Sequence, residues 1–425
     1  MHICVLGAGV IGVTTSYYLL AAGHEVTLID AQEGAGLGAS YGNGAQLSYS
    51  YVAPLADPSV WTKWPHYLFS RHSPLTMKPT PDAAQWTWLM QFLKACNAER
   101  ARQTTVSLLQ LAYLSRREMT RLRADPALES LDFQHRIAGK LVMFTEQASF
   151  EAARRQVEFQ AHHGSRQDVL DADACLGLEP ALQSSQRDWA GGVYTADEEV
   201  GNCALFCQGL LNALRSKPGF RFRGGAAVTG ADMSRGQLNA VRIGRNEKLE
   251  ADAFVLTMGA GSAGFARQAG FALPVYPLKG YSITLGLAGL NEHAAPRISI
   301  TDASRKIVYA RIGDDLRVAG RVELVGHDKR IPERAIEELK SGTTALFPQA
   351  AGRLASAALS PWAGFRPATP TGLPVIGPSP VKRLYLNTGH GGLGWTLACG
   401  SASLIARQLS GERPELDMEA YQLAS

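Results

Sequence analysis

The sequence lacks several features that mark common classes of protein. Its six cysteines include no Cys-x2-Cys pair, so the spacing typical of a zinc site is absent and we expect no metal site. They are better interpreted as small buried hydrophobes of a reduced, cytosolic-side protein. Lys and Arg are scattered, and the net charge is only +4. Without a run of like charge we expect no nucleic-acid partner.

Long hydrophobic runs are also missing. No segment supplies the run of about 18 apolar residues that a membrane-spanning helix needs. The apolar N-terminus lacks a basic region and is interrupted by glycine, unlike a secretory signal. We therefore expect a location on the cytoplasmic side, with any contact to the inner membrane peripheral. Residues 61–75 combine Trp, Tyr, Phe, Lys, Arg and His, which suits a membrane surface but also a helix and turn of a substrate domain.

Glycine, by contrast, is abundant, at 43 of 425 residues, against a usual share of about 7%. Such an excess is typical of tight turns and of close contacts between backbone and ligand. Hydrophobic residues make up 46% of the chain, enough for a large core. The length predicts more than one domain.

The first thirty residues predict a nucleotide-binding turn. Residues 2–6 and 25–30 have the pattern of strands, and residues 10–22 that of a helix. Between them lies Gly7-Ala8-Gly9-Val10-Ile11-Gly12. In this context Gly7 permits the turn, Gly9 lets a pyrophosphate approach the backbone, and Gly12 lets helix and strand pack closely. The helix N-terminus, including Val10 and Ile11, offers N–H groups to the phosphates.

An acidic residue completes this motif. Asp30 lies at the end of the second strand and is followed by Ala31. Its carboxylate can accept hydrogen bonds from ribose hydroxyls and would repel a 2′-phosphate. The motif alone suits NAD or FAD. Two further segments in which glycine follows a strand (251–264 and 389–396), together with the small-residue loop at 34–46, favour FAD, because a long flavin nucleotide needs loops from several parts of the chain.

The remaining pattern predicts an α/β fold with two discontinuous domains. Helical patterns cover much of 60–125, 148–162 and 332–346, and alternating patterns at 275–284 and 306–324 predict antiparallel strands. We assign residues 1–85, 165–272 and 361–425 to a Rossmann-type FAD-binding domain. Residues 86–164 and 273–360 form the expected substrate domain, with an antiparallel sheet and helices. The active site is expected between them.

Specific segments carry a family resemblance. They are VLGAGVIGVTTSYYLLAAGHEVTLID, YVAPLADP, FSRHSPL, VYPLKGYSIT, GFRPATPTGLPVIG and LNTGHGGLGWTLACGS. In this order, from residue 3 to about 401, the chain resembles the glycine oxidase/D-amino acid oxidase (DAO) class of flavoproteins. Within that class it is most similar to the bacterial D-amino acid dehydrogenases (small subunit). The resemblance implies a non-covalent FAD.

The resemblance also assigns cofactor contacts. The loop that follows the pyrophosphate, ribityl chain and ring in relatives corresponds here to Ser40, Asn43, Gly44, Ala45 and Gln46. Val228 lies on the strand whose backbone faces adenine, and Gly259 with Ala260 forms a further contact. The loop and helix start beneath the flavin correspond to Gly389, His390, Gly391, Gly392, Leu393, Gly394 and Thr396. A helix N-terminus there would stabilise negative charge on the reduced ring.

Substrate residues are expected to include one arginine and three tyrosines. Arg366 lies in GFRPATPTGLPVIG, and in relatives this arginine pairs with the substrate carboxylate, a role that suits a planar guanidinium. Tyr51, Tyr281 and Tyr309 are candidates for a hydrogen bond to the carboxylate or for covering the substrate. For each tyrosine, a place in the core or on the surface is the alternative.

The resemblance implies oxidative deamination of D-amino acids such as D-alanine to 2-oxo acids and ammonia. A hydride would pass from Cα to flavin N5, and the enzyme would need few acid–base residues. The dehydrogenase relatives pass electrons to a quinone or respiratory chain, and the oxidase relatives to O2. The alternatives are an oxidase of glycine, sarcosine or another secondary amine or opine, and an FAD-binding subunit that is inactive alone.

Overall fold

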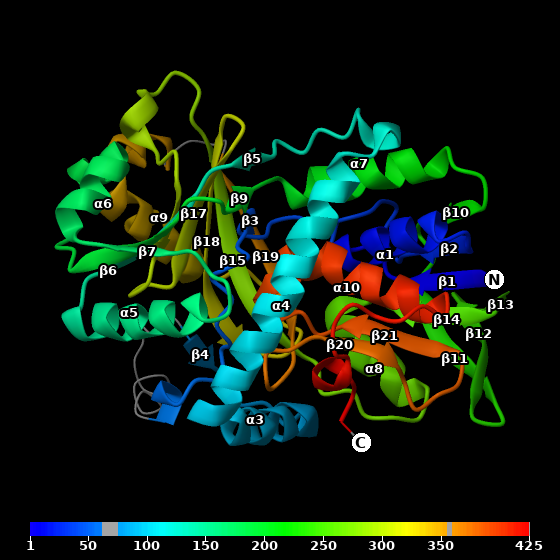
Figure 1. The fold of residues 1–425 in the computed structure, drawn as a ribbon. Helices are drawn as coiled ribbons and strands as arrows, with labels where there is room; N and C mark the ends of the chain where they lie inside the picture. The colour runs from blue at the N-terminus through cyan, green and yellow to red at the C-terminus, as the bar shows by residue number, and fades with distance from the viewer. Residues whose placement is uncertain (62–74, 355–358, 425) are drawn as a thin grey trace.

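The computed structural model describes residues 1–61, 75–354 and 359–424. The described chain is built around two large sheets that lie on opposite sides of the long helix α4 (Ala98–Arg123) in Figure 1. Both termini belong to the half of the molecule that contains the six-stranded sheet. The mixed α/β fold predicted from the sequence is confirmed.

The six-stranded sheet has the order β10-β2-β1-β14-β21-β20. All neighbours are parallel except β20 and β21. The strands are β1 (His2–Leu6), β2 (Glu25–Ile29), β10 (Phe220–Arg223), β14 (Ala253–Leu256), β20 (Val375–Pro378) and β21 (Leu384–Thr388). Since β1, β2 and β14 are apolar on both faces, they sit in the middle of the sheet between two layers.

Alternate residues of these strands feed two separate cores. Ile3 and Val5 of β1 face a core that includes α1 (Val10–Ala21), α7 (Cys203–Arg215) and α10 (Gly394–Leu409). Cys4 and Leu6 face the other core, which includes α8 (Ser262–Gln268). That second core also includes the antiparallel meander of β11 (Val228–Ser234), β12 (Gln237–Ile243) and β13 (Glu247–Glu250).

The second large sheet has nine strands in the order β19-β15-β18-β17-β16-β6-β8-β7, with β4 paired to β18. The strands are β4 (Leu75–Met77), β6 (Lys140–Phe144), β7 (Asp168–Leu170), β8 (Gly191–Thr195), β15 (Tyr276–Gly286), β16 (Ser299–Asp302), β17 (Ile307–Ile312), β18 (Asp315–Leu324) and β19 (Ser360–Ala368). Most pairs are antiparallel, as the alternating sequence predicted. Helix α9 (Glu333–Leu346) packs on one face.

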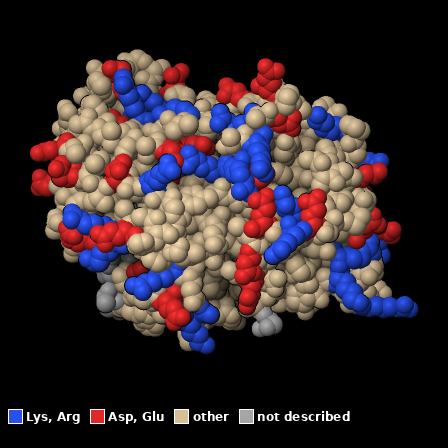
Figure 2. Space-filling model, viewed as in Figure 1, with Lys and Arg blue, Asp and Glu red and all other residues tan. Residues whose placement is uncertain are grey.

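A small sheet and the remaining helices complete the fold. The small sheet has the order β3-β9-β5, formed by β3 (Gln46–Leu47), β9 (Glu199–Val200) and β5 (Arg136–Ile137). The other helices are α3 (Ala83–Ala95), α5 (Gln147–Ala161) and α6 (Ala172–Leu178). Acidic and basic side chains are interspersed over the face shown in Figure 2.

Two groups of elements lie elsewhere than the sequence-based division suggests. Helix α4, expected in the substrate domain, packs against α10 and shares the core of the six-stranded sheet. Strands β7 and β8, expected with the FAD domain, pair within the nine-stranded sheet. The two-domain division stays a proposal, with the two large sheets as its centres.

In the part of the chain that the structure describes, no helix is both long and apolar enough to cross a bilayer. The aromatic and basic stretch at 61–75, expected either at a membrane surface or in a substrate domain, lies almost wholly outside the described residues.

Candidate cofactor and substrate site

The turn between β1 and α1 has the geometry of a phosphate-binding loop. Gly7 has φ +107°, and its N–H donates to Ile29 O at 2.8 Å. A Cβ at Gly12 would lie 1.7 Å from Gly7 O, so only glycine lets the helix approach the strand this closely. Gly9 caps α1, and the first turn of α1 has no acidic residue. The helix therefore presents its positive end, with Val10 and Ile11, to a bound anion.

Asp30 is tied directly to this turn. One carboxylate oxygen accepts from Ala8 N at 2.6 Å and the other from Gln32 N at 2.7 Å. The backbone oxygen of Asp30 accepts from Ala226 N at 2.8 Å, which brings the start of β11, and with it Val228, to the same end of the sheet. Ala31 is exposed beside it. These residues suit the adenosine end of a dinucleotide.

The predicted flavin loop begins at the same turn. The Ser40 hydroxyl accepts from Val10 N at 3.0 Å, and Gly36 N donates to Ala8 O at 2.9 Å. The loop then crosses to the nine-stranded sheet, where Ser282 Oγ donates to Gly42 O at 2.7 Å and the Arg317 guanidinium to Asn43 O at 2.9 Å. The loop therefore bridges the two halves of the molecule.

Beyond Asn43 the loop is held close to both halves. Gly44 lies against Val308, where a Cβ would be 3.0 Å from the valine methyl. Ala45 has φ +57°, and its N–H donates to the Asn43 side chain at 3.0 Å. Gln46 then opens β3. Two residues later Ser48 N donates to Thr396 Oγ1 at 3.1 Å, which ties the loop to the start of α10.

The glycine-rich segment before α10 also lies in this region. Gly389 and Gly391 have φ +82° and +55°, conformations that favour glycine. His390 between them is buried, and its Nε2 lies 3.0 Å from Ser401 Oγ. Burial lowers its pKa to about 3, so its ring is neutral. Gly392 and Leu393 form the short turn that leads into Gly394, and no side chain caps α10.

A third glycine turn follows β14. Gly259 has φ +55° and, with Ala260, forms a short helical turn. A Cβ at Gly259 would lie 4.0 Å from Pro367 in β19. Since β1, β14 and β21 are parallel neighbours, the turns after all three meet at one edge of the sheet, the usual place for a nucleotide. The starts of α1 and α10 have no side-chain cap, and the three turns at this edge contain glycine. Both features suit the binding of FAD.

Arg366 is placed beside this segment. Its strand ends at Ala368, which forms a bridge with His390, and a Cβ at Gly392 would lie 3.8 Å from Arg366 Cδ. Its guanidinium donates to Arg321 O at 3.0 Å. Burial lowers the pKa of Arg366 to about 10. Arg366 is half-buried. Among the described residues it forms no ion pair with a carboxylate within 4.0 Å, so its guanidinium is free to bind an acidic ligand.

Trp362, which the sequence analysis missed, lies next to Arg366. Gly280 and Gly364 are direct partners on β15 and β19. A Cβ at Gly280 would lie 2.4 Å from the Arg366 guanidinium, and one at Gly364 would lie 2.1 Å from the Trp362 ring. The two glycines thus leave a depression in which a guanidinium and an indole lie side by side. The sequence W-A-G-F-R offered a signal. In a strand, alternate residues point to the same face, which places Trp362, Gly364 and Arg366 together.

Tyr51 lies on the same face of the nine-stranded sheet. The Lys140 ammonium lies 4.7 Å from the centre of its ring. That ammonium also donates to Gln46 Oε1 at 2.6 Å and to Ser48 Oγ at 3.0 Å. Burial lowers the pKa of Lys140, while the charge of the buried Glu198 opposes that shift. Lys140 and Glu198 had no sequence signal, because they are brought to the flavin loop only by strand pairing.

Tyr281 and Tyr309 lie on the opposite face from Arg366. The Tyr281 hydroxyl donates to Glu323, whose other oxygen pairs with Arg321 at 2.9 Å. The Tyr309 ring packs edge-on against Phe347, at 5.2 Å between centroids, in the core beneath α9. The expected substrate contacts of these two tyrosines are not supported by this placement.

Comparisons with known proteins identify the family of this chain. A family model described as FAD dependent oxidoreductase (DAO) matches residues 2–408. The chain is 46% identical over 427 residues to D-amino acid dehydrogenase 2 of Ralstonia nicotianae, covering 100% of both chains. It is 43% identical over 416 residues to D-amino acid dehydrogenase 2 of Pseudomonas aeruginosa, covering 98% and 96%.

Solved structures share the fold. Glycine oxidase from Geobacillus kaustophilus superposes with a TM-score of 0.78 at 19% identity, covering 99% of this chain and 98% of the other. L-proline dehydrogenase from P. horikoshii gives 0.76 at 14% identity, with coverages of 99% and 96%. At such identities the likeness describes the architecture alone.

Proposed function

This chain belongs to the DAO family of FAD-dependent oxidoreductases, and from that premise we propose that it oxidises D-amino acids to 2-oxo acids and ammonia. The relatives at 46% and 43% identity carry the name D-amino acid dehydrogenase. They are matched along essentially their whole length, so the proposal extends to the complete reaction.

One observation carries the proposal: a half-buried guanidinium with no acidic partner among the described residues. Partial removal of a charge from water without an acidic partner is costly, and Arg366 lies half-buried in this way beside the glycine segment expected beneath the flavin. A planar guanidinium binds a carboxylate through two parallel hydrogen bonds. We propose that Arg366 binds the substrate carboxylate and thereby fixes the position of Cα.

When bound, FAD supplies the acceptor for the two electrons and the hydrogen that leave Cα. The turn at Gly7–Gly12, Asp30 and the loop from Ser40 to Gln46 would hold it, and the start of α10 would stabilise negative charge on the ring. Arg366 orients the substrate by its carboxylate. Trp362 forms an apolar wall beside that group, and Tyr51 lies on the same face as a further contact.

The electron acceptor and the location in the cell are also proposals. We propose a quinone or another respiratory acceptor, with peripheral contact at the cytoplasmic side of the inner membrane. These relatives are named dehydrogenases rather than oxidases, which supports the choice of acceptor.

The first experiment is an anaerobic visible spectrum of the purified holoenzyme before and after D-alanine, with L-alanine as control. Bleaching of the flavin bands by the D-enantiomer alone is the expected result. If neither enantiomer bleaches the flavin but glycine, sarcosine or an opine does, the family assignment stands and the D-amino acid proposal fails. Reoxidation of the bleached enzyme by a quinone faster than by air would support the dehydrogenase.

A further inference from the structure

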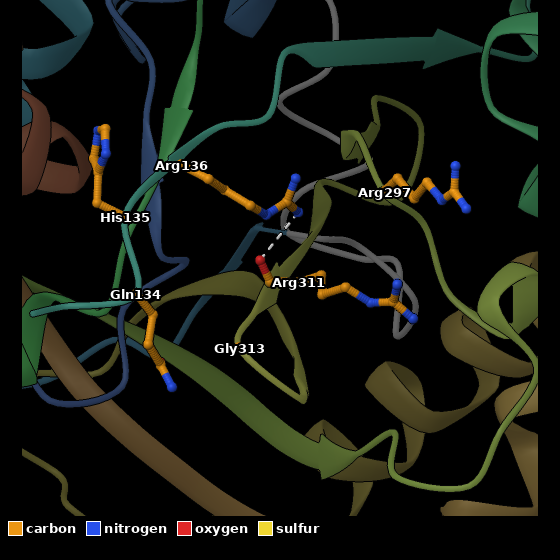
Figure 3. A pocket seen from close by; sticks show the side chains of 6 residues that line it. All are labelled: Gln134, His135, Arg136, Arg297, Arg311 and Gly313. Carbon is orange, nitrogen blue, oxygen red and sulfur yellow. Dashed lines mark hydrogen bonds between the residues drawn. The ribbon is translucent and has the colours of Figure 1, made fainter.

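An open pocket on the surface, called the three-arginine cavity, lies away from the flavin loop. It has a volume of about 500 Å³, within the range of small-ligand sites. Its lining consists of Gln134, His135, Arg136, Arg297, Arg311 and Gly313. Figure 3 shows the three arginine side chains reaching the cavity from separate segments, while the ring of His135 points away. None of the lining residues is acidic.

This cavity is distinct from the candidate cofactor site. Along β17, Ala310 and Ile312 face an apolar cluster that contains Ala45 of the flavin loop. Arg311 lies between them in sequence, so its side chain points to the other side of the strand. The cavity and the flavin loop are therefore separated by the strand and its apolar contacts.

Two of the guanidinium groups have no carboxylate within 4.0 Å among the described residues. Arg136 donates to a neutral acceptor, the backbone oxygen of Arg311, at 3.2 Å (Figure 3). The Nε of Arg311 is buried and has no hydrogen-bond partner in the part of the chain that the structure describes. Burial, together with the nearby charge of Arg311, lowers the pKa of Arg136, against an opposing effect of Glu179. The positive charges of Arg136 and Arg311 are thus held close together without a carboxylate in direct contact.

The third arginine is already partly neutralised. Arg297 pairs with the exposed Glu292, and the buried Glu179 accepts from Arg297 N at 2.7 Å. These two carboxylates reduce the net charge around the cavity, but neither lines it. The surplus charge therefore lies on Arg136 and Arg311.

We infer that this cavity binds a phosphate group, carried by a small soluble molecule or by a lipid headgroup. Guanidinium groups match phosphate oxygens in pairs. A phosphate offers three acceptor oxygens in different directions, which three arginines from separate segments can share, whereas a carboxylate offers two in one plane. The inference is independent of the substrate proposed above.

The test uses the FAD-saturated enzyme at constant ionic strength. Inorganic phosphate is titrated by calorimetry against the wild type, Arg311→Gln, Arg136→Gln and the control Arg245→Gln, whose side chain lies in an exposed turn. We expect saturable binding to the wild type and the control, and at least tenfold weaker binding to the two cavity variants. The flavin spectrum and the melting temperature show whether each variant is folded.

A second arm distinguishes the two sources of phosphate. Cosedimentation compares vesicles of phosphatidylcholine with vesicles that also contain phosphatidylglycerol. Binding to the anionic vesicles that is lost in Arg311→Gln assigns the site to a lipid headgroup, and arginine-dependent binding of free phosphate alone assigns it to a soluble ligand. Absence of both, equal binding by the cavity variants, or phosphate binding that displaces the flavin would overturn the inference.

Discussion

At the scale of single residues, the charge on Arg366 is the feature most directly tied to chemistry. The side chain is half-buried, has no acidic partner among the described residues and lies beside Gly392. Its planar group, rather than its charge alone, is expected to matter. A lysine at this position would keep the charge but lose the second hydrogen bond.

We predict that Arg366→Lys lowers kcat/KM for D-alanine by about 10²- to 10³-fold, equivalent to the loss of a charged hydrogen bond of roughly 3–4 kcal/mol. The FAD content should stay that of the wild type. Steady-state rates with an artificial dye acceptor give the measurement, with the exposed Arg245→Lys as control. A change below threefold would remove Arg366 from carboxylate binding.

Trp362 should influence which substrate side chains the enzyme prefers. Its ring fills the space above Gly364 next to the guanidinium, so a smaller ring leaves room there. We predict that Trp362→Phe raises the kcat/KM ratio of D-phenylalanine to D-alanine about tenfold, the usual scale for a change of this size in an apolar pocket. The control is Trp86→Phe on the exposed face of α3, and an unchanged ratio would contradict the assignment.

His390 makes the stability depend on pH. Its folded-state pKa is about 3, against an ordinary value of 6.5, because the ring is buried. Between these values the unfolded chain binds more protons than the folded protein, so the stability is fully present above pH 6.5 and falls as the pH is lowered. We predict that the wild type loses up to about 2 kcal/mol more than His390→Gln between pH 7 and 5. Urea unfolding at both pH values measures the free energy of unfolding of each protein. An equal loss of stability in the wild type and in His390→Gln would contradict the prediction.

At the scale of elements, the β1–α1 unit depends on one close approach. Because a Cβ at Gly12 would lie 1.7 Å from Gly7 O, Gly12→Ala must move the helix away from the strand. We predict a loss of FAD binding of at least tenfold, measured by flavin fluorescence on dialysis. Gly23 ends the same helix with φ +83° and open space around it. Gly23→Ala should cost only about 1 kcal/mol of stability and retain FAD, which makes it the matched control.

At the scale of the whole molecule, FAD binding should stabilise both halves together. The predicted contacts run from Gly7 through the loop at Gly42–Gln46, which is bonded to the nine-stranded sheet, to Thr396 at the start of α10. A ligand present at a hundred times its Kd raises the free energy of unfolding by about 2.7 kcal/mol. We predict that removing FAD lowers the melting temperature by roughly 3 °C for a chain of this size and opens the loop to proteolysis. An unchanged melting temperature and cleavage pattern would contradict this bridging role.

The sequence by itself determined the features that depend on short stretches of chain. The glycine spacing at residues 7–12, the strand before it and Asp30 after it predicted the nucleotide-binding unit, and the structure and family match confirm the fold and the FAD dependence. The predicted individual contacts to cofactor and substrate stay predictions. Local pattern suffices for such a unit because its turn, helix and strand are adjacent in the chain.

Only the tertiary structure decided which distant residues share a face. Tyr281 and Tyr309 alternate onto the α9 side of the nine-stranded sheet, away from Arg366, because pairing between strands far apart in sequence sets the direction of each side chain. The same pairing places Trp362 beside Arg366. Helix α4 joins the other core because its apolar face fits α10. The three-arginine cavity likewise exists only where segments near 136, 297 and 311 meet.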